Sequence, residues 1–175
     1  IFSISKKLKL KENKIFKIVN KFKGLKYRQQ IIYNSNKITF INDSKATTFA
    51  STMNILKVLK KVYWLVGGIG KLGDKFTLKK NECKNIKAYI FGKNKNFFIN
   101  KFKNKISYYY FKDLNTAVKQ VLKEINNSKD DLHRTVLFSP ASASFDSFKN
   151  FEERGKYFNF LLKKYKVKEI VNATR

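Results

Sequence analysis

The chain has 175 residues, of which 43% are hydrophobic and 15% aromatic. A chain of this length and composition can form one domain with a hydrophobic core and is too apolar to be disordered. The single cysteine excludes a disulfide framework or a cysteine-built zinc site, and the single histidine argues against a histidine metal cluster or a Ser-His-Asp triad. No apolar run approaches the roughly 20 residues of a membrane helix, so we expect no membrane association. The chain begins with Ile1 rather than Met, so we expect it to be part of a longer protein.

The charge is strongly positive, because 39 lysines and arginines against 12 acidic residues give a formal net charge of +27. A nucleic acid or another anionic partner is one interpretation of such a charge. Arginine, however, is the residue that favours bidentate phosphate and base contacts, and the only arginines are Arg28, Arg134, Arg154 and Arg175. The lysines are spread along a chain rich in Lys, Asn, Ile, Phe and Tyr, which is typical of an A/T-rich coding sequence. Solvated lysine faces are therefore the favoured interpretation, and nucleic acid is not the expected partner.

The first third of the sequence predicts two different local structures. Residues 1–27 form a basic lead in which apolar residues recur at helical spacing, and Gly24 ends this pattern. A connector follows at 24–28. Gln30–Tyr33 and Lys37–Ile41 are short β-rich runs around a polar Asn-Ser-Asn turn, which predicts an antiparallel hairpin.

Helical and β patterns then alternate to the end of the chain. Helices are predicted at 49–59, at 114–125 after Asp113 as N-cap, and from Ser144 to Tyr165. Four apolar runs predict buried strands: Val62–Val66, Ala88–Phe91, Ser107–Phe111 and Thr135–Phe138. The alternation implies βαβ units. The predicted fold class is α/β, with a three-layer, Rossmann-like, mainly parallel sheet and an antiparallel edge hairpin.

The loops after the strands are where an open α/β sheet binds ligands. The first such loop, residues 42–48, reads Asn-Asp-Ser-Lys-Ala-Thr-Thr and opens the predicted helix at 49. Thr47 or Thr48 is the natural N-cap, and Lys45 beside a helix N-terminus could hold a carboxylate or phosphate. An ordinary polar turn with a capping threonine is the alternative.

The second loop, residues 67–74, reads Gly-Gly-Ile-Gly-Lys-Leu-Gly-Asp. Its glycines would let the backbone approach a ligand, and Lys71 would supply a positive charge. The loop matches neither a P-loop nor a dinucleotide-binding fingerprint. A flexible glycine turn is the alternative.

The third loop begins at Ser139 and reads Ser-Pro-Ala-Ser-Ala-Ser-Phe-Asp before a segment that ends in Phe-Glu-Glu-Arg-Gly at 151–155. Backbone N–H groups and serine hydroxyls would line the start of the predicted helix, with Asp146 in its first turn. The simplest interpretation of Phe148 and Phe151 is core packing. Arg154 and Gly155 have no obvious packing reason inside a helix.

Taken together and in this order, the Asp-Ser-Lys-Ala-Thr sequence at 43–47, Gly67-Gly68 and the 139–155 segment resemble the C-terminal domain of the Mur ligases. The Asp-Ser-Lys-Ala-Thr form resembles the branch that adds D-glutamate. The resemblance implies that residues 1–28 are the end of a central ATPase domain and its linker, and that 29–175 are the C-terminal, amino-acid-binding domain. The Gly-Lys-Ser/Thr loop of the central domain and the N-terminal domain are absent from this sequence, so we expect the chain alone to be inactive.

The resemblance also implies an activity: a cytoplasmic ligase of peptidoglycan synthesis that uses ATP and Mg²⁺. ATP would phosphorylate the carboxylate of UDP-N-acetylmuramoyl-L-alanine, and the amine of D-glutamate would attack the acyl phosphate to give an amide. The missing central domain would bind most of the ATP and the Mg²⁺, and no metal site is expected in this chain.

Roles for individual residues follow from the same resemblance. The residues that would hold D-glutamate are Thr47, Lys71, Ser144, Phe145 and Phe151. Arg28, Asp43 and Lys45 would contact ATP, and Asp43 and Lys45 would also stand at catalytic positions. Two other interpretations remain: a stand-alone anion- or nucleic-acid-binding domain, and a Mur-type or folylpolyglutamate-type ligase domain for another amino acid.

Overall fold

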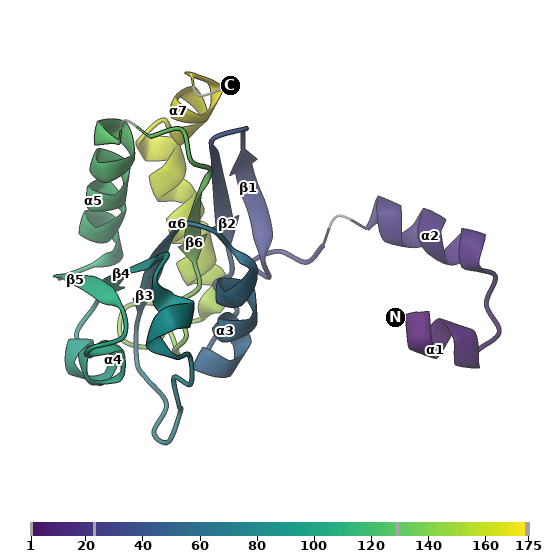
Figure 1. The fold of residues 1–175 in the computed structure, drawn as a ribbon, viewed down its shortest axis with the longest axis horizontal. Helices are drawn as coiled ribbons and strands as arrows, with labels where there is room; N and C mark the ends of the chain where they lie inside the picture. Colours follow the sequence, from purple (N-terminus) through teal and green to yellow (C-terminus); the bar gives the residue numbers. More distant parts are fainter. Residues whose placement is uncertain (1, 23, 129, 174–175) are drawn as a thin grey trace.

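A computed structural model describes residues 2–22, 24–128 and 130–173, and within them one six-stranded sheet forms the centre of the molecule (Figure 1). The strands are β1 (Gln30–Asn34), β2 (Ile38–Asn42), β3 (Val62–Gly67), β4 (Ile86–Phe91), β5 (Ser107–Phe111) and β6 (Arg134–Phe138), in the spatial order β1-β2-β6-β3-β4-β5. β1 runs antiparallel to β2, and all other neighbours are parallel. The mainly parallel sheet and its antiparallel edge hairpin are therefore confirmed.

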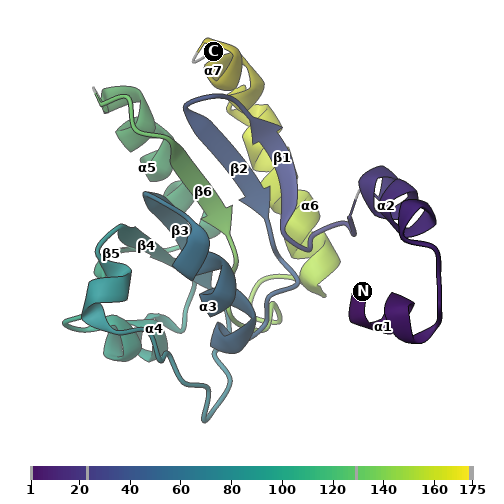
Figure 2. The same ribbon diagram turned by 45° about the vertical axis from the view of Figure 1, so that its right-hand side comes forward.

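Helices cover both faces of the sheet (Figure 2). One face carries α3 (Phe49–Val58), the 3₁₀ helix η1 (Lys80–Cys83) and α4 (Lys95–Phe102); the other carries α5 (Leu114–Asn127), α6 (Phe151–Lys164) and α7 (Val167–Ala173). The inner strands β2, β3 and β6 are buried along their whole length, and their alternate side chains feed two separate hydrophobic cores. This arrangement confirms the three layers.

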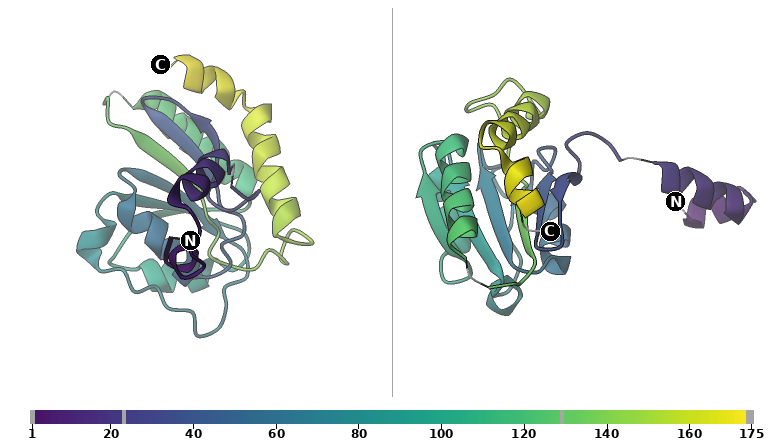
Figure 3. Two further views of the ribbon diagram at one scale, coloured as in Figure 1. Left: turned by 90° about the vertical axis from the view of Figure 1, so that its right-hand side faces the viewer. Right: turned by 90° about the horizontal axis from the view of Figure 1, so that it is seen from above.

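The N-terminal lead folds as two helices, α1 (Phe2–Lys7) and α2 (Glu12–Lys21), that lie apart from the sheet (Figure 3). Ile15 of α2 is buried, whereas most other apolar side chains of the two helices, including those of Phe16 and Ile18, are exposed. Within the described part of the chain, no helix has the length and apolar character needed to span a membrane.

The helix predicted to begin at Ser144 begins only at Phe151, so that prediction was wrong at its start. The carbonyl of Ser144 accepts the N–H groups of Ser147 and Phe148 and closes a turn. Asn150 then caps α6, because its side chain accepts the N–H of Glu153 at 2.8 Å. Asp146 consequently lies in the turn before the helix and not in its first turn, where Glu152 and Glu153 stand.

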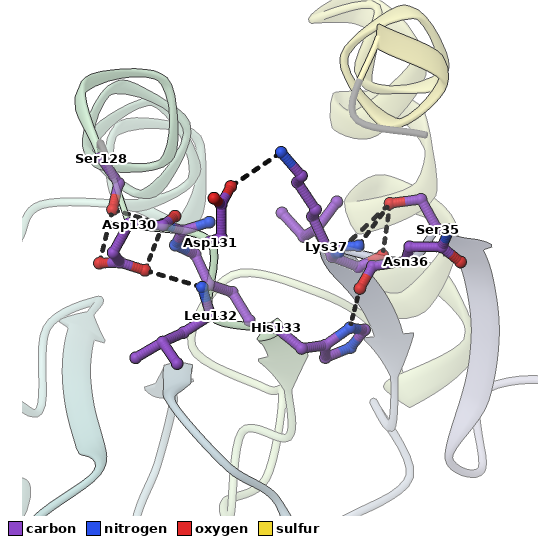
Figure 4. A network of polar contacts seen from close by, with 10 residues as sticks. Ser35, Asn36, Lys37, Ser128, Asp130, Asp131, Leu132 and His133 are labelled. Atoms are coloured by element: carbon purple, nitrogen blue, oxygen red, sulfur yellow. Dashed lines mark hydrogen bonds and ion pairs between the residues drawn. The ribbon is translucent and has the colours of Figure 1, made fainter.

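The loop that enters β6 is held by a polar network at the amino ends of the parallel strands (Figure 4). The Arg134 guanidinium, whose residue is only 5% exposed, donates to the Asp130 carboxylate at 2.7 Å and to the Ser128 hydroxyl at 2.6 Å. Lys37 pairs with Asp131 at 2.9 Å, which ties the loop to β2. This network therefore fixes the end of the sheet opposite the candidate loops.

Candidate functional site

The three candidate loops leave the sheet side by side. β6 lies between β2 and β3 and is parallel to both, so the carboxyl ends of these strands, at Asn42, Phe138 and Gly67, are neighbours. The chain passes from β2 across to β3 and returns to β6 only at the end, which makes this the point where the strand order reverses. Such a switch point is where open α/β sheets form a ligand-binding crevice.

Asp43 joins the first loop to two other segments. Its carboxylate accepts the backbone N–H of Gln29 at 3.1 Å through one oxygen and the Ser139 hydroxyl at 2.9 Å through the other. Burial raises the pKa of the Asp43 carboxyl above its ordinary value, although both hydrogen bonds and the nearby Arg28 act in the opposite direction. Asp43 thus anchors the linker on one side and the loop after β6 on the other.

The residues expected to face ATP share one cleft. Arg28, Asp43 and Lys45 line a cleft of about 370 Å³ together with the apolar side chains of Phe22 and Leu25. The ammonium of Lys45 lies 3.9 Å from the centre of the Phe151 ring, a cation–π contact. Phe151 is therefore a neighbour of Lys45 at the start of α6 and is only half-buried rather than part of the core.

The glycine loop is tied to the loop after β6. Ile69 and Ala143 exchange two backbone hydrogen bonds of 3.0 Å, which places the Lys71 loop beside the segment that leads to Ser144. The same loop also reaches α3, because Asp74 accepts the N–H of Phe49 at 2.7 Å. Lys71 itself is exposed.

The N-terminus of α3 is already partly bonded within the chain. Thr48 is its N-cap and accepts the N–H of Ser51 at 3.3 Å, which confirms one of the two predicted caps. Because Asp74 takes the N–H of Phe49, an anionic ligand here would depend on side chains more than on these two N–H groups.

The remaining expected ligand residues lie in the loops that follow the strands. Ser144 is buried, Thr47 is exposed and the Phe145 side chain is 72% exposed. Among the described residues, no hydrogen bond or ion pair joins the side chains of Thr47, Lys71 and Ser144. The fold brings their backbones to one edge of the sheet and leaves their side chains unengaged with each other.

Sequence reasoning gave no role to Gly155 or Asn42, and the structure supplies one for each. A Cβ atom on Gly155 would lie 2.4 Å from Cδ1 of Tyr27, so only glycine lets the linker tyrosine pack on α6. Asn42 donates to the carbonyl of Gly155 at 2.9 Å and to the side chain of Asn159 at 2.8 Å. A glycine inside a helical pattern was the signal that could have pointed to this contact.

Among the described residues, no set of three or more His, Cys, Asp or Glu side chains lies close enough together to hold a metal ion. The basic side chains of Arg28 and Lys45 in the cleft fit a polyphosphate rather than a cation.

Comparison with known proteins gives a consistent family. No protein-family model matches the chain. The chain is 36% identical over 164 residues to the UDP-N-acetylmuramoylalanine–D-glutamate ligase of Rickettsia prowazekii. The matched region covers 94% of this chain and 37% of that enzyme. It is 35% identical to the enzyme of the same name from a Wolbachia of Brugia malayi, over 89% of this chain and 31% of that enzyme. The chain is related to the Mur ligases.

The fold agrees with this relationship. The structure matches that of the Mur ligase UDP-N-acetylmuramate–alanine ligase from Thermotoga maritima with a TM-score of 0.55, over 95% of this chain and 36% of that one. At 13% identity this match shows the Mur ligase fold alone. The chain spans about a third of the length of the relatives it matches.

The raised pKa of Asp43 gives this site a testable pH dependence. The folded protein binds the Asp43 proton more tightly than the unfolded chain, so the free energy of unfolding falls as pH rises from about 4 through the raised pKa. Asp43→Asn removes that ionisation while its amide can still pair with Gln29 and Ser139. We expect the variant to be at least as stable as the wild type at pH 7, and to lose this advantage towards pH 4.

Urea unfolding between pH 4 and pH 8 measures this difference directly. A wild type that gains stability relative to Asp43→Asn on going from pH 4 to pH 7 would contradict the sign, because that result requires a lowered pKa in the folded state.

Proposed function

We propose that this chain is the amino-acid-binding, C-terminal part of a cytoplasmic ligase that joins D-glutamate to UDP-N-acetylmuramoyl-L-alanine in peptidoglycan synthesis. Residues 1–28 would be the end of the central ATPase domain and its linker, and 29–175 the C-terminal domain. The observation that carries the proposal is the convergence of the loops after β2, β3 and β6 at one switch point, in a chain whose relatives bear that name. Alone, the chain would not catalyse ligation, because the phosphoryl-transfer residues would lie in the missing domains.

D-glutamate would be bound by side chains at the crevice. Its two carboxylates call for charge-assisted hydrogen bonds, which the Lys71 ammonium and the hydroxyls of Ser144 and Thr47 can supply. Phe145 and Phe151 would cover the apolar part of the ligand. The exposure of Lys71, Thr47 and Phe145 leaves these side chains free to close on it.

The cleft beside the linker would receive the phosphates of ATP. When bound, ATP would supply the phosphoryl group that activates the carboxylate of the sugar nucleotide. Lys45 and Arg28 would place positive charge where phosphoryl oxygens carry negative charge, and the Phe151 ring would orient the Lys45 ammonium. Asp43 would act by holding the linker and the loop after β6 in place, since both its oxygens are bonded within the chain. Mg²⁺ would be bound mainly by the central domain.

The proposal predicts a selective defect when the amino-acid pocket is altered. In a complete enzyme that contains this chain, Lys71→Ala and Ser144→Ala should each raise the KM for D-glutamate about 10- to 100-fold and leave the KM for ATP unchanged. The reason is that each removes one hydrogen bond to a charged group, a contribution of about 1.5–3 kcal/mol. Steady-state phosphate release, measured at varied D-glutamate, tests this expectation.

Lys75→Ala is the matched control, because Lys75 is another exposed lysine four residues along. It should leave both KM values unchanged. An enzyme that does not use D-glutamate, or that shows normal kinetics with both pocket variants, would refute the proposed function. A preference for another amino acid, or salt-sensitive nucleic-acid binding without ligase activity, would favour the other interpretations.

A further inference from the structure

Arg154 is a fully buried cation that contacts the loop after β2 and the loop after β6 at once. Its residue is 0% exposed. One terminal nitrogen, Nη2, donates to the carbonyl of Ser44 at 2.9 Å and to the carbonyl of Ser142 at 3.0 Å, while Nε donates to the Ser44 hydroxyl at 3.2 Å. Ser44 stands between Asp43 and Lys45, and Ser142 precedes Ser144 by two residues. A single planar guanidinium therefore joins the two loops.

The third loop is connected to the same group. The Ser142 hydroxyl donates to the carbonyl of Gly67 at 2.6 Å. Gly68 lies against the guanidinium, since a Cβ atom there would be 3.2 Å from Nη1 of Arg154. With the Ile69–Ala143 pairing, these contacts relate the position of the Lys71 loop to that of Ser44 and Ser142.

α6 supports the guanidinium from behind. Arg154 lies in the first turn of this 14-residue helix, whose first residue, Phe151, accepts the Ser44 hydroxyl through its carbonyl at 2.8 Å. Asn42 binds the same helix through the carbonyl of Gly155. The guanidinium is thus held on a helix rather than on a loop, which is what precise positioning requires.

Stability does not explain why a charged Arg154 side chain is buried here. Within the described residues no carboxylate forms an ion pair with Arg154, and its Nη1 atom has no hydrogen-bond partner. Burial lowers the pKa of Arg154 to about 10, with Asp146 acting in the opposite direction, so the side chain stays cationic at neutral pH. A buried, incompletely paired charge contributes little or nothing to stability compared with an apolar residue, and a role in arranging the surrounding groups accounts for its presence.

We propose that Arg154 is a positioning residue for the D-glutamate pocket, which holds the loops after β2, β3 and β6 in register without touching the ligand. This inference rests on the proposed function. It assigns the spacing between Thr47, Lys71 and Ser144, whose side chains are not hydrogen-bonded to one another, to one buried guanidinium.

Arg154→Lys tests the inference in the complete enzyme. Lysine keeps the charge, but its single nitrogen cannot replace both Nη2, which bonds the carbonyls of Ser44 and Ser142, and Nε, which bonds the Ser44 hydroxyl. We expect the KM for D-glutamate to rise about tenfold or more, because the ligand groups lose their spacing. Arg134→Lys is the matched control: it alters a second buried arginine, at the opposite end of β6, and should lower stability while leaving the KM for D-glutamate unchanged.

A merely structural role gives a different result. Loss of folded protein lowers the apparent kcat with the active fraction and leaves KM unchanged, in both arginine variants. An unchanged KM in folded Arg154→Lys, alongside a raised KM in Lys71→Ala, would overturn the inference and leave the proposed function standing. Unchanged KM values in Lys71→Ala, Ser144→Ala and Arg154→Lys together would refute the proposed function itself.

Ser142→Ala keeps the inference testable if Arg154→Lys does not fold. It removes only the hydroxyl that binds the Gly67 carbonyl and leaves the Arg154 contact to the Ser142 carbonyl in place. We expect a rise of about three- to tenfold in the KM for D-glutamate. An unchanged KM in this variant would overturn the inference, because the loop after β3 would then lose its bond to Ser142 without any effect on the pocket.

Discussion

Gly68→Ala is expected to destabilise the protein by about 3 kcal/mol or more and to raise the KM for D-glutamate. Gly68 has φ of +120°, a conformation that residues with a Cβ atom rarely adopt. Its Cβ would also lie 2.4 Å from the carbonyl oxygen of Ala143 and 2.5 Å from the Ser142 hydroxyl. Since the carbonyl belongs to the backbone, the two loops would have to separate, and the Ile69–Ala143 pairing would be lost.

Gly73→Ala is the control for backbone strain alone. Gly73 also has positive φ, +79°, but no atom lies within 4 Å of its ideal Cβ position. We expect a loss of about 1–2 kcal/mol, which is the strain of a left-handed residue without any collision. Urea unfolding of both variants makes the comparison, and equal losses of stability would show that the contact between the two loops does not matter.

Phe49→Ala is expected to lower the free energy of unfolding by about 3–5 kcal/mol, as for other fully buried phenylalanines. Phe49 is 0% exposed and is the hub of an aromatic cluster beneath the site. The rings that surround it are those of Trp64, Phe76, Phe97, Phe98 and Phe102. Because Phe49 also opens α3 directly after Thr48, the cavity would form immediately under the first candidate loop.

Phe160→Ala provides the comparison for loss of a phenylalanine at the surface. This side chain lies on α6 and is 55% exposed, so its removal should change stability by no more than about 0.5 kcal/mol. Thermal and urea unfolding of the two variants measures the difference. A loss in Phe49→Ala as small as that in Phe160→Ala would mean that the aromatic cluster does not carry the core.

The inner strands could be predicted from the sequence because each is a short apolar run with a clear stop. Val62–Val66 ends at two glycines and Thr135–Phe138 ends before Ser139-Pro140, and the structure ends β3 and β6 within one residue of these positions. The start of α6 could not be predicted from the spacing of phenylalanines, because Phe145 and Phe148 continue the helical period into a turn. The decisive local signal is Asn150 followed three residues later by Glu153, whose side chain accepts the N–H of Lys149.

The candidate residues could be placed after the strands from the sequence, because most of them lie in contiguous motifs, whereas their roles stay predictions. Arg28, Asp43 and Lys45 line one cleft, and their contacts with ATP stay a prediction. The role of Arg154 could not be predicted from the sequence. Its partners Ser44 and Ser142 are 110 and 12 residues away and are bonded mainly through backbone carbonyls, which carry no sequence signal. That Asp74 bonds the first turn of α3 likewise depends on the path of the glycine loop.

The packing of Tyr27 on Gly155 determines where the molecule can pivot. The Tyr27 carbonyl accepts the N–H of Lys45 at 3.0 Å, and Gln29 is bonded to Asp43, so the chain from Tyr27 onward travels with the sheet. Gly24, with positive φ and open space around it, stands before this fixed segment. Any swing of the sheet about its N-terminal helices must therefore turn upstream of Tyr27. Residues 27–29 would then transmit that movement to Asp43 and Lys45, because they are hydrogen-bonded to both.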